Sequence, residues 1–338
     1  MISFEIHNVS DTAYGILIWD TPLHDTPSNF LSVNYEGSEL RYEGPMCKWG
    51  EPSDEAYIIL APRESRSAEI DISKVYAIQR PGEYAVTLES ELPDAYPLAD
   101  RASSIARNRA SHQRLALERV TATITVEPGD SPRMTLGQEI RLREAGQEPP
   151  DVATREPFMP WLIGGTASQQ ADVRAAHAHA VYEVGRSLEV LGYFGPANGY
   201  YKTWFGNNVA WDPIIAPGVT TYNITVSHFQ AIKNIMNFGT FPVQTYVLSP
   251  PGQYCNSNKF AYTVGGTRTV WLCQLFWNAS LYGIPDSKYG TLIHEWSHNA
   301  ASTEDYEYGV ATCKALAGLN CKRAVWNADN HEYFAEFL

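Results

Sequence analysis

The sequence predicts two domains, the first built of β-strands and the second built mainly of helices with a few strands. The chain has 338 residues, a length at which two domains of ~150 residues each are usual. Short alternating apolar runs fill residues 1–127, whereas apolar residues recur at helical spacing from about Ser168 onward. Hydrophobic residues make up 44% of the chain, so both halves can bury a packed core.

Residues 1–127 are expected to form an antiparallel, immunoglobulin-like β-sandwich. Their short runs are rich in β-branched and aromatic residues, and Pro, Gly, Asn and Asp separate these runs as turns require. The Arg- and Ala-rich stretch at 100–119 is predicted to leave the sheet as a helical or mobile excursion. The predicted strands are SFEIHNVS, AYGILIW, AYIILAP, SAEIDIS, GEYAVTLES and RVTATITVEP.

Residues 128–166 are predicted to be a linker, because Pro, Gly and charged residues are dense there. Residues 167–338 are expected to form an α+β domain in which helices dominate, since apolar positions follow the helical period over long stretches. The predicted helices cover 169–194, 221–238 and the region from Tyr289, and the predicted strands cover 241–248 and 260–276.

Charge and composition argue against several classes of protein. The net charge of −13 disfavours nucleic acid or an anionic membrane surface as a partner, and no apolar run approaches the ~18 residues of a transmembrane helix. Cys255, Cys273, Cys313 and Cys321 lie in the last third without a C-x-x-C pair, which favours two local disulfides in an exported protein. We therefore expect a secreted protein whose signal peptide is not part of this sequence.

The stretch HEWSH places two histidines and a glutamate at the spacing of a zinc site. In a helix, His294 and His298 share one face, where two neutral imidazoles can bind one Zn²⁺. Glu295 would then lie near an open coordination position. Zinc lowers the pKa of its bound water to about 7, and the glutamate could take a proton as that water attacks a carbonyl. Leu292 and Ile293 predict a half-buried helix here rather than a solvated one.

A catalytic zinc needs a third protein ligand, and the sequence offers several candidates. A metzincin would carry a glycine and a histidine where this chain has Ala301 and Glu304, so that arrangement is excluded. A glutamate on a later helix, as in thermolysin-like sites, could be Glu332 or Glu336. The remaining candidate is Asp305, in the stretch STEDYEYG.

The stretches HEWSH and STEDYEYG together resemble the aspzincins, the family of deuterolysins and peptidyl-Lys metalloendopeptidases. That family carries H-E-x-x-H followed by G-T-x-D-x-x-Y-G, and this chain departs from it at Ser302, which replaces the first glycine. The residues that match the second motif are Thr303, Asp305, Tyr308 and Gly309.

This resemblance implies a zincin-like catalytic domain and a zinc metalloendopeptidase with one catalytic Zn²⁺. Its implied metal ligands are His294, His298 and Asp305, with Glu295 as the general base. Tyr308 would donate a hydrogen bond to the oxyanion of the tetrahedral intermediate. Peptides and proteins would be the substrates.

The stretch NADNHEYFAEF resembles the segment that lines the S1′ pocket in the peptidyl-Lys branch. The matching residues are Asp329 and Glu332, one helical turn apart. Two carboxylates on one face would bind a lysine ammonium, so the resemblance implies cleavage on the amino side of lysine. One alternative is a broad deuterolysin-like protease that prefers basic proteins. Another, from a different class, is a β-sandwich binding protein with a structural zinc site.

The cysteines fit the same interpretation. The spacing of Cys255 and Cys273 is like that of a disulfide in the family, which implies a bond between them. We predict a second disulfide, Cys313–Cys321, because only a short loop separates these two residues.

The first domain, especially YEGPMCKWGEP and PGEYAVTL, resembles the N-terminal domain found before many aspzincin catalytic domains. The chain would then be a monomeric pro-enzyme, similar to secreted aspzincin toxins of bacterial pathogens, which its own prodomain helps to fold and inhibits. Lys48 could enter the acidic pocket as a substrate mimic, or Cys47 could ligate the zinc as a thiolate. We expect the lysine to be the inhibitory residue. No lysine lies between Lys74 and Lys202, so a strictly lysine-directed enzyme could not cut its own linker, where we expect maturation.

Overall fold

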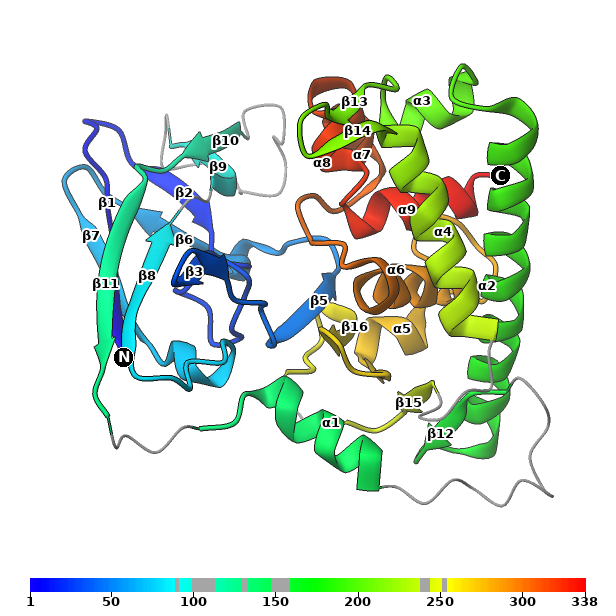
Figure 1. Cartoon of the computed structure of the whole chain (residues 1–338), viewed down its shortest axis with the longest axis horizontal. Coiled ribbons are helices and arrows are strands. Elements are labelled where there is room, and N and C mark those ends of the chain that lie inside the picture. The colour runs from blue at the N-terminus through cyan, green and yellow to red at the C-terminus, as the bar shows by residue number, and fades with distance from the viewer. Residues whose placement is uncertain (89–90, 99–112, 129–132, 147–158, 238–243, 251–253) are drawn as a thin grey trace. The chain divides into compact units, whose positions relative to one another are not determined.

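The computed structural model describes residues 1–88, 91–98, 113–128, 133–146, 159–237, 244–250 and 254–338. The chain divides into two compact units (Figure 1). One unit contains Met1–Pro45 and Glu51–Arg141, and the other contains Met46–Gly50 and Leu142–Leu338. Most of the predicted excursion at 100–119, and residues 147–158 of the predicted linker, lie outside the described residues.

Antiparallel strands make up the first unit, as the alternating runs predict. Among its described residues, strands pair in a two-stranded sheet of order β1-β7 and in four-stranded sheets of order β10-β9-β2-β6 and β11-β8-β3-β4. Phe4, Ile16 and Leu60 belong to its buried core. The strands are β1 (Ile2–His7), β2 (Tyr14–Leu17), β3 (Leu31–Tyr35), β4 (Ser38–Glu39), β6 (Tyr57–Leu60), β7 (Ser65–Ile70), β8 (Gly82–Leu88), β9 (Glu91–Pro97), β10 (Gln113–Ala116) and β11 (Val120–Val126), with short turns of 3₁₀ helix η1 (Asp54–Ala56) and η2 (Ile72–Lys74).

The second unit contains a five-stranded sheet of order β12-β15-β17-β16-β5. Strands β12, β15 and β17 run parallel to one another, and β16 is antiparallel to β17. The edge strand β5 comes from the N-terminal half of the sequence, and all five of its residues are buried. The strands are β5 (Pro45–Trp49), β12 (Trp161–Ile163), β15 (Thr245–Val247), β16 (Lys259–Val264) and β17 (Thr269–Leu272), with a separate pair β13 (Ala210–Asp212) and β14 (Ala216–Thr220).

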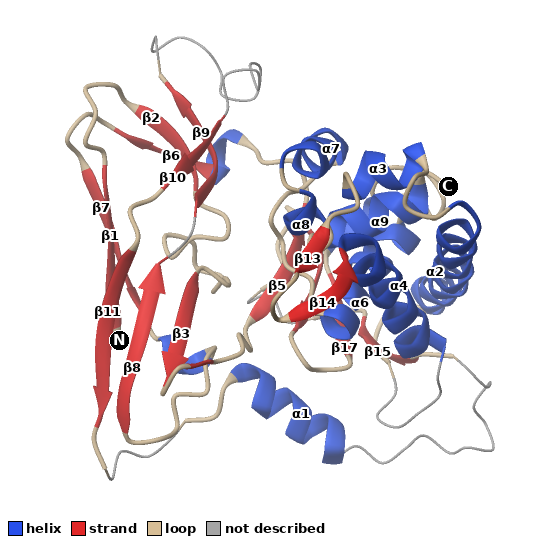
Figure 2. Cartoon of the chain, turned by 45° about the horizontal axis from the view of Figure 1, so that its top comes forward, coloured by secondary structure: helices blue, strands red, loops and turns tan. Residues whose placement is uncertain are grey.

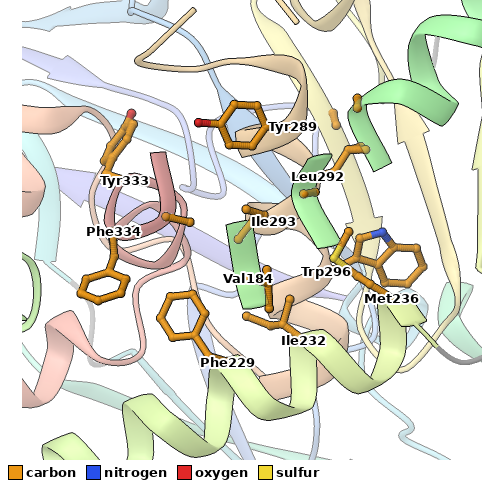
Figure 3. Packing of buried hydrophobic residues seen from close by; sticks show 14 of the residues in the cluster. Val184, Phe229, Ile232, Met236, Tyr289, Leu292, Ile293, Trp296, Tyr333 and Phe334 are labelled. Carbon is orange, nitrogen blue, oxygen red and sulfur yellow. The ribbon is translucent and has the colours of Figure 1, made fainter. Parts of the chain in front are cut away.

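Helices dominate the second unit, as the change of period predicts (Figure 2). Their apolar faces meet in one core, in which Phe229, Ile293 and Phe334 come from three different helices (Figure 3). None of the helices within the described ranges is long and apolar enough to cross a membrane. The helices are α2 (Ala167–Phe194), α3 (Gly199–Phe205), α4 (Thr221–Asn237), α5 (Gln274–Asn278), α6 (Lys288–Ala301), α7 (Val310–Leu319), α8 (Cys321–Ala324) and α9 (Ala328–Glu336).

Helix α1 (Leu136–Gly146) lies inside the segment predicted to be a linker. Glu144 of this helix accepts hydrogen bonds from the Arg268 backbone N–H (2.8 Å) and the Thr269 hydroxyl (2.7 Å) at strand β17. These partners are distant in sequence, so the local density of Pro, Gly and charge gave no sign of them.

A buried hydrogen-bond chain connects helices α2, α4 and α6 with strand β15. The Trp296 indole N–H donates to the Tyr246 hydroxyl (2.7 Å), which donates to Nδ1 of His177 (2.8 Å). Nε2 of His177 donates in turn to the Met236 carbonyl (3.2 Å). This direction of donation requires a neutral imidazole, and burial lowers the pKa of His177 to about 4.

Candidate active site

Helix α6 carries both histidines and the glutamate of HEWSH. It begins at Ser287, whose hydroxyl accepts a hydrogen bond from the Gly290 N–H (2.9 Å), as a helix N-cap does. It ends at Ser302 in the left-handed conformation (φ 55°), which a glycine adopts without strain. Ser302 can therefore form the same turn as the glycine of the family motif, and this turn leads to Asp305. His294, Glu295 and His298 are all completely buried.

Three atoms from this helix and its following turn converge on one point. Nε2 of His294 lies 3.2 Å from Nε2 of His298 and 3.1 Å from Oδ1 of Asp305, and the third distance, from His298 to Asp305, is 3.3 Å. Four ligands around zinc at ~2.0–2.1 Å would be about 3.3 Å apart, so this triangle fits three corners of a zinc tetrahedron. These residues can hold one Zn²⁺ and leave its fourth position open.

Hydrogen bonds at the other ring nitrogens fix the orientation of both imidazoles. Nδ1 of His294 donates to Oδ1 of Asp329 (2.7 Å), and Nδ1 of His298 donates to the carbonyl of Thr303 (2.7 Å). With these protons on Nδ1, both Nε2 lone pairs face the convergence point, while Asp305 Oδ1 is buried without a hydrogen bond. Such outer partners are typical of metal-binding histidines.

The other candidates for the third ligand are engaged elsewhere. Glu332 faces the Nδ1 side of His294 at 3.6 Å, where the imidazole already donates to Asp329. Glu336 accepts hydrogen bonds from the backbone N–H groups of Asp286 (3.1 Å) and Ser287 (2.8 Å). Among the described residues, only Asp305 supplies a carboxylate to the paired Nε2 atoms.

Glu295 lies beside His294, His298 and Asp305, and its carboxyl group has a raised pKa. Both of its carboxylate oxygens are buried and accept no well-formed hydrogen bond. Burial raises the pKa of Glu295 to about 8, although nearby positive charge at His298 and Lys48 opposes the rise. A carboxylate whose pKa lies near neutrality can both accept and return a proton, as a general base must.

Lys48 of strand β5 inserts its ammonium into an acidic pocket. Its Nζ lies 2.9 Å from Asp286, 3.1 Å from Asp329 and 2.7 Å from Glu332, and the whole residue is buried. The rings of Phe260 and Tyr333 lie beside it, with centroids 5.3 and 5.5 Å away. Burial alone would lower the pKa of Lys48, but the three carboxylates outweigh it and hold that pKa well above its usual range. The ammonium is therefore charged.

Asp286 is a member of this pocket that the sequence did not suggest. It lies in the loop before α6, in the left-handed conformation (φ 61°), which aspartate tolerates better than most residues. The Tyr333 hydroxyl donates to its Oδ1 (2.8 Å), and its own N–H donates to Glu336. No motif or spacing connects Asp286 to Asp329 and Glu332, because only the fold brings the loop to helix α9.

Tyr308 contacts the backbone just before Lys48. Its hydroxyl donates to the carbonyl oxygen of Cys47 (2.9 Å). The carbonyl that precedes a pocket-bound lysine is the one that a protease cutting before lysine would attack. The cluster of metal-ligand atoms in the described part of the chain does not include the Cys47 sulfur. The structure therefore brings the lysine, and not the cysteine thiolate, to the site.

One predicted disulfide is present and the other is wrong. Cys255 and Cys273 form a disulfide. Cys313 and Cys321 are both free thiols, and Cys313 lies buried in the helical core. There the Asn327 amide donates to its sulfur (3.5 Å), so that partner takes the place expected for Cys321.

The chain is similar to several known proteases. Residues 195–336 match the aspzincin family model, described as lysine-specific metallo-endopeptidase. An extracellular protease of Aeromonas hydrophila is 27% identical over 339 residues, covering 99% of this chain and 87% of that protein. A peptidyl-Lys metalloendopeptidase of Pleurotus ostreatus is 36% identical over 181 residues, covering 52% of this chain and 95% of that protein. A solved zinc peptidase from Grifola frondosa has a TM-score of 0.42 and 32% identity, covering 51% of this chain and 96% of that one.

The Pleurotus relative is matched along almost its whole length, and the family model spans the helices and turns that hold HEWSH and STEDYEYG. These matches overturn the alternative of a binding protein with a structural zinc. The chain belongs to the aspzincin family and is a zinc metallopeptidase.

Proposed function

We propose that the chain is the zymogen of a secreted zinc metalloendopeptidase that cuts peptide bonds on the amino side of lysine. The observation that carries the proposal is the position of Lys48, whose ammonium contacts three carboxylates while the preceding carbonyl contacts Tyr308. A relative named extracellular protease covers nearly the whole chain, which supports secretion. Relatives named peptidyl-Lys metalloendopeptidases support the lysine preference.

Each residue of the site has a distinct task in hydrolysis. Zn²⁺ bound by His294, His298 and Asp305 would supply the Lewis acidity that makes water nucleophilic near neutral pH. Glu295 accepts the proton of the attacking water and returns it to the leaving amine. Tyr308 donates to the carbonyl oxygen as that oxygen becomes negative.

The pocket explains why lysine would be preferred over other residues. A lysine ammonium has three N–H donors, and Asp286, Asp329 and Glu332 offer it one acceptor each. A neutral side chain would leave the buried carboxylates of Asp329 and Glu332 without a cation, which is costly. The guanidinium of arginine carries five N–H donors in a planar fork, which does not match three converging oxygens.

Lys48 would act as the inhibitor by occupying this pocket in the uncut chain. The first unit would then be a prodomain with an immunoglobulin-like sandwich, and the catalytic domain would follow the linker that contains the maturation site. Replacing the lysine by alanine removes the charge that the carboxylates require. We therefore expect Lys48→Ala to give the unprocessed chain activity on a peptide with lysine after the cut bond.

A matched substitution separates inhibition from general loosening of the fold. Lys74→Ala removes a lysine from the 3₁₀ helix η2 of the first unit and should leave latency unchanged. If Lys48→Ala stays as inert as the parent chain, Lys48 is not the inhibitory residue. Glu295→Gln in the Lys48→Ala chain should abolish hydrolysis while zinc binding, measured by metal analysis, persists. Retained hydrolysis would contradict the assignment of the general base.

A further inference from the structure

The peptide bond between Cys47 and Lys48 lies in the register of a bond about to be cut. The lysine side chain fills the acidic pocket, and the carbonyl on its amino side accepts the Tyr308 hydrogen bond at 2.9 Å. A segment bound in the opposite chain direction would present the carbonyl of another residue to Tyr308. Strand β5 is therefore bound as a substrate is bound, and not merely as a plug.

The helix that carries the general base also adjoins this bond. Oδ1 of Asp329 accepts hydrogen bonds from both the Lys48 ammonium (3.1 Å) and Nδ1 of His294 (2.7 Å), so the lysine lies directly beside the residues of HEWSH. Glu295 follows His294 in that helix, and both of its carboxylate oxygens are buried without a hydrogen bond. The oxyanion donor and the specificity pocket thus hold a single peptide bond beside the general base, and the Lys48 nitrogen becomes the leaving amine when that bond is hydrolysed.

Both sides of the bond are held firmly. Strand β5 occupies the edge of the five-stranded sheet with all of its residues buried. Beyond the lysine, the Gly50 N–H donates to the Asn258 carbonyl (2.9 Å), and the Lys259 ammonium lies over the Trp49 ring at 4.1 Å. These contacts hold the Cys47–Lys48 peptide bond in one position, so even a slow hydrolysis can take place there.

We propose that the chain hydrolyses its own Cys47–Lys48 bond in cis, an inference that rests on the proposed function. One water molecule is consumed. Its oxygen bonds to the carbonyl carbon of Cys47, and the C–N bond to Lys48 breaks. One proton of the water passes through Glu295 to the nitrogen, so the products are a Cys47 carboxylate and a Lys48 α-amine.

The cut would not by itself release the inhibitor. The ammonium of Lys48 keeps its contacts with the three carboxylates, since none of them involves the broken bond. On the other side, strands β1, β2 and β3 stay paired with β7, β6 and β8, which follow the cut in sequence. The nicked chain therefore remains associated, and the linker, which lacks lysine, still has to be cut by another route.

Intact-mass measurement of the full chain under denaturing conditions tests the proposal. After zinc is added, the wild-type chain should release a 47-residue fragment and a second fragment that begins Lys-Trp-Gly-Glu. Glu295→Gln should lower the rate of this nick by at least ~100-fold, because the proton acceptor is lost. The Asn258–Lys259 bond is a built-in control, since this lysine is also buried but donates to the Tyr254 carbonyl (3.0 Å) instead of the acidic pocket. It should stay intact.

Three results would overturn the inference. A wild-type chain that cuts lysine peptides after its linker is digested, yet keeps Cys47–Lys48 intact beforehand, refutes self-cleavage and leaves the proposed function standing. A nick whose rate falls in proportion when the protein is diluted tenfold would be made by another molecule and not in cis. If neither the nick nor any cut before lysine is seen, the proposed function itself fails, and the inference fails with it.

Discussion

The three carboxylates around Lys48 are not equivalent. Asp329 also accepts hydrogen bonds from Nδ1 of His294 (2.7 Å) and the Gly309 N–H (2.8 Å), so it orients the His294 imidazole as well as the lysine. Burial raises the pKa of Glu332 well above its usual range, against the effect of Lys48. Asp286 keeps 32% of its side chain exposed to solvent, and its sequence-distant partners include Lys48, Tyr333 and Glu336. It is the residue at which lysine selection can be tested with least disturbance of the zinc site.

Asp286→Asn should therefore weaken lysine selection in the activated enzyme. Loss of one charge-assisted hydrogen bond costs ~1.5–3 kcal/mol, which lowers kcat/KM for a lysine peptide by roughly 10–100-fold. Cleavage of a matched peptide with a neutral residue after the bond should change little. Asp212→Asn is the control, because Asp212 caps the N–H groups of Ile214 and Ile215, away from the pocket. Equal losses on both peptides would contradict a role in selection.

Tyr308→Phe removes the hydroxyl that contacts the carbonyl before the lysine. Loss of one oxyanion donor typically costs about 100-fold in kcat, and KM should change far less. Tyr306→Phe makes the same change two residues away, where the ring packs against Arg323 at 4.5 Å, and should retain activity. Steady-state kinetics on one lysine peptide distinguish the two variants. An unchanged kcat in Tyr308→Phe would exclude it as the oxyanion donor.

At the scale of elements, helices α6 and α9 meet so closely that one position needs glycine. A Cβ on Gly290 would overlap the Glu336 carboxylate and crowd Glu332. Glu336 in turn holds the loop that presents Asp286, through the N–H groups of Asp286 and Ser287. The first turn of helix α6 therefore packs directly against the residues that form and support the lysine pocket.

Gly290→Ala should lower the free energy of unfolding by ~1–3 kcal/mol, as overpacking does, and weaken lysine selection as well. The control is Gly185→Ala in helix α2, where an added Cβ meets no atom within 4 Å. That change should stabilise the protein by ~0.5–1 kcal/mol, because alanine suits a helix interior better than glycine. Urea unfolding of the three proteins gives the comparison. A Gly290→Ala chain as stable as the wild type would show that the two helices can separate at little cost.

For the whole molecule, the free energy of unfolding depends on pH through the buried hydrogen-bond chain Trp296–Tyr246–His177–Met236. The pKa of His177 is lowered to about 4 in the folded state, against about 6.5 when the chain is unfolded. This contribution to stability is complete above pH 6.5 and is lost as the pH falls toward 4, at most about 3 kcal/mol. Unfolding free energies measured at pH 7 and pH 4 should differ less in His177→Gln. A wild-type difference in His177→Gln would contradict the assignment.

Local patterns in the sequence predicted much of the architecture and the convergence of His294, His298 and Asp305. The change from alternating to helical period predicted a strand-rich half and a helix-rich half, because each period follows from one kind of element. HEWSH and STEDYEYG place His294, His298 and Asp305 within twelve residues, so helix geometry and one turn are enough to bring them together. The resemblance of NADNHEYFAEF to a lysine-binding segment pointed to Asp329 and Glu332.

What the sequence could not show depends on contacts between distant segments. Asp286 joins the pocket through the loop before α6, and β5 joins the second unit across more than two hundred residues of chain. Helix α1 inside the predicted linker and the unbonded Cys313 have the same cause, since Arg268 and Asn327 supply their partners from elsewhere in the fold.

We propose that an acidic pocket beside His294, His298 and Asp305 selects the lysine after the cut bond. The most direct measurement is mass-spectrometric mapping of the cuts that the activated enzyme makes in a denatured protein rich in both lysine and arginine. Nearly all new amino termini should be lysine, and Glu295→Gln should produce none. Cuts scattered over many residues would indicate a broad deuterolysin-like protease, and cuts before arginine as often as before lysine would contradict the three-carboxylate pocket.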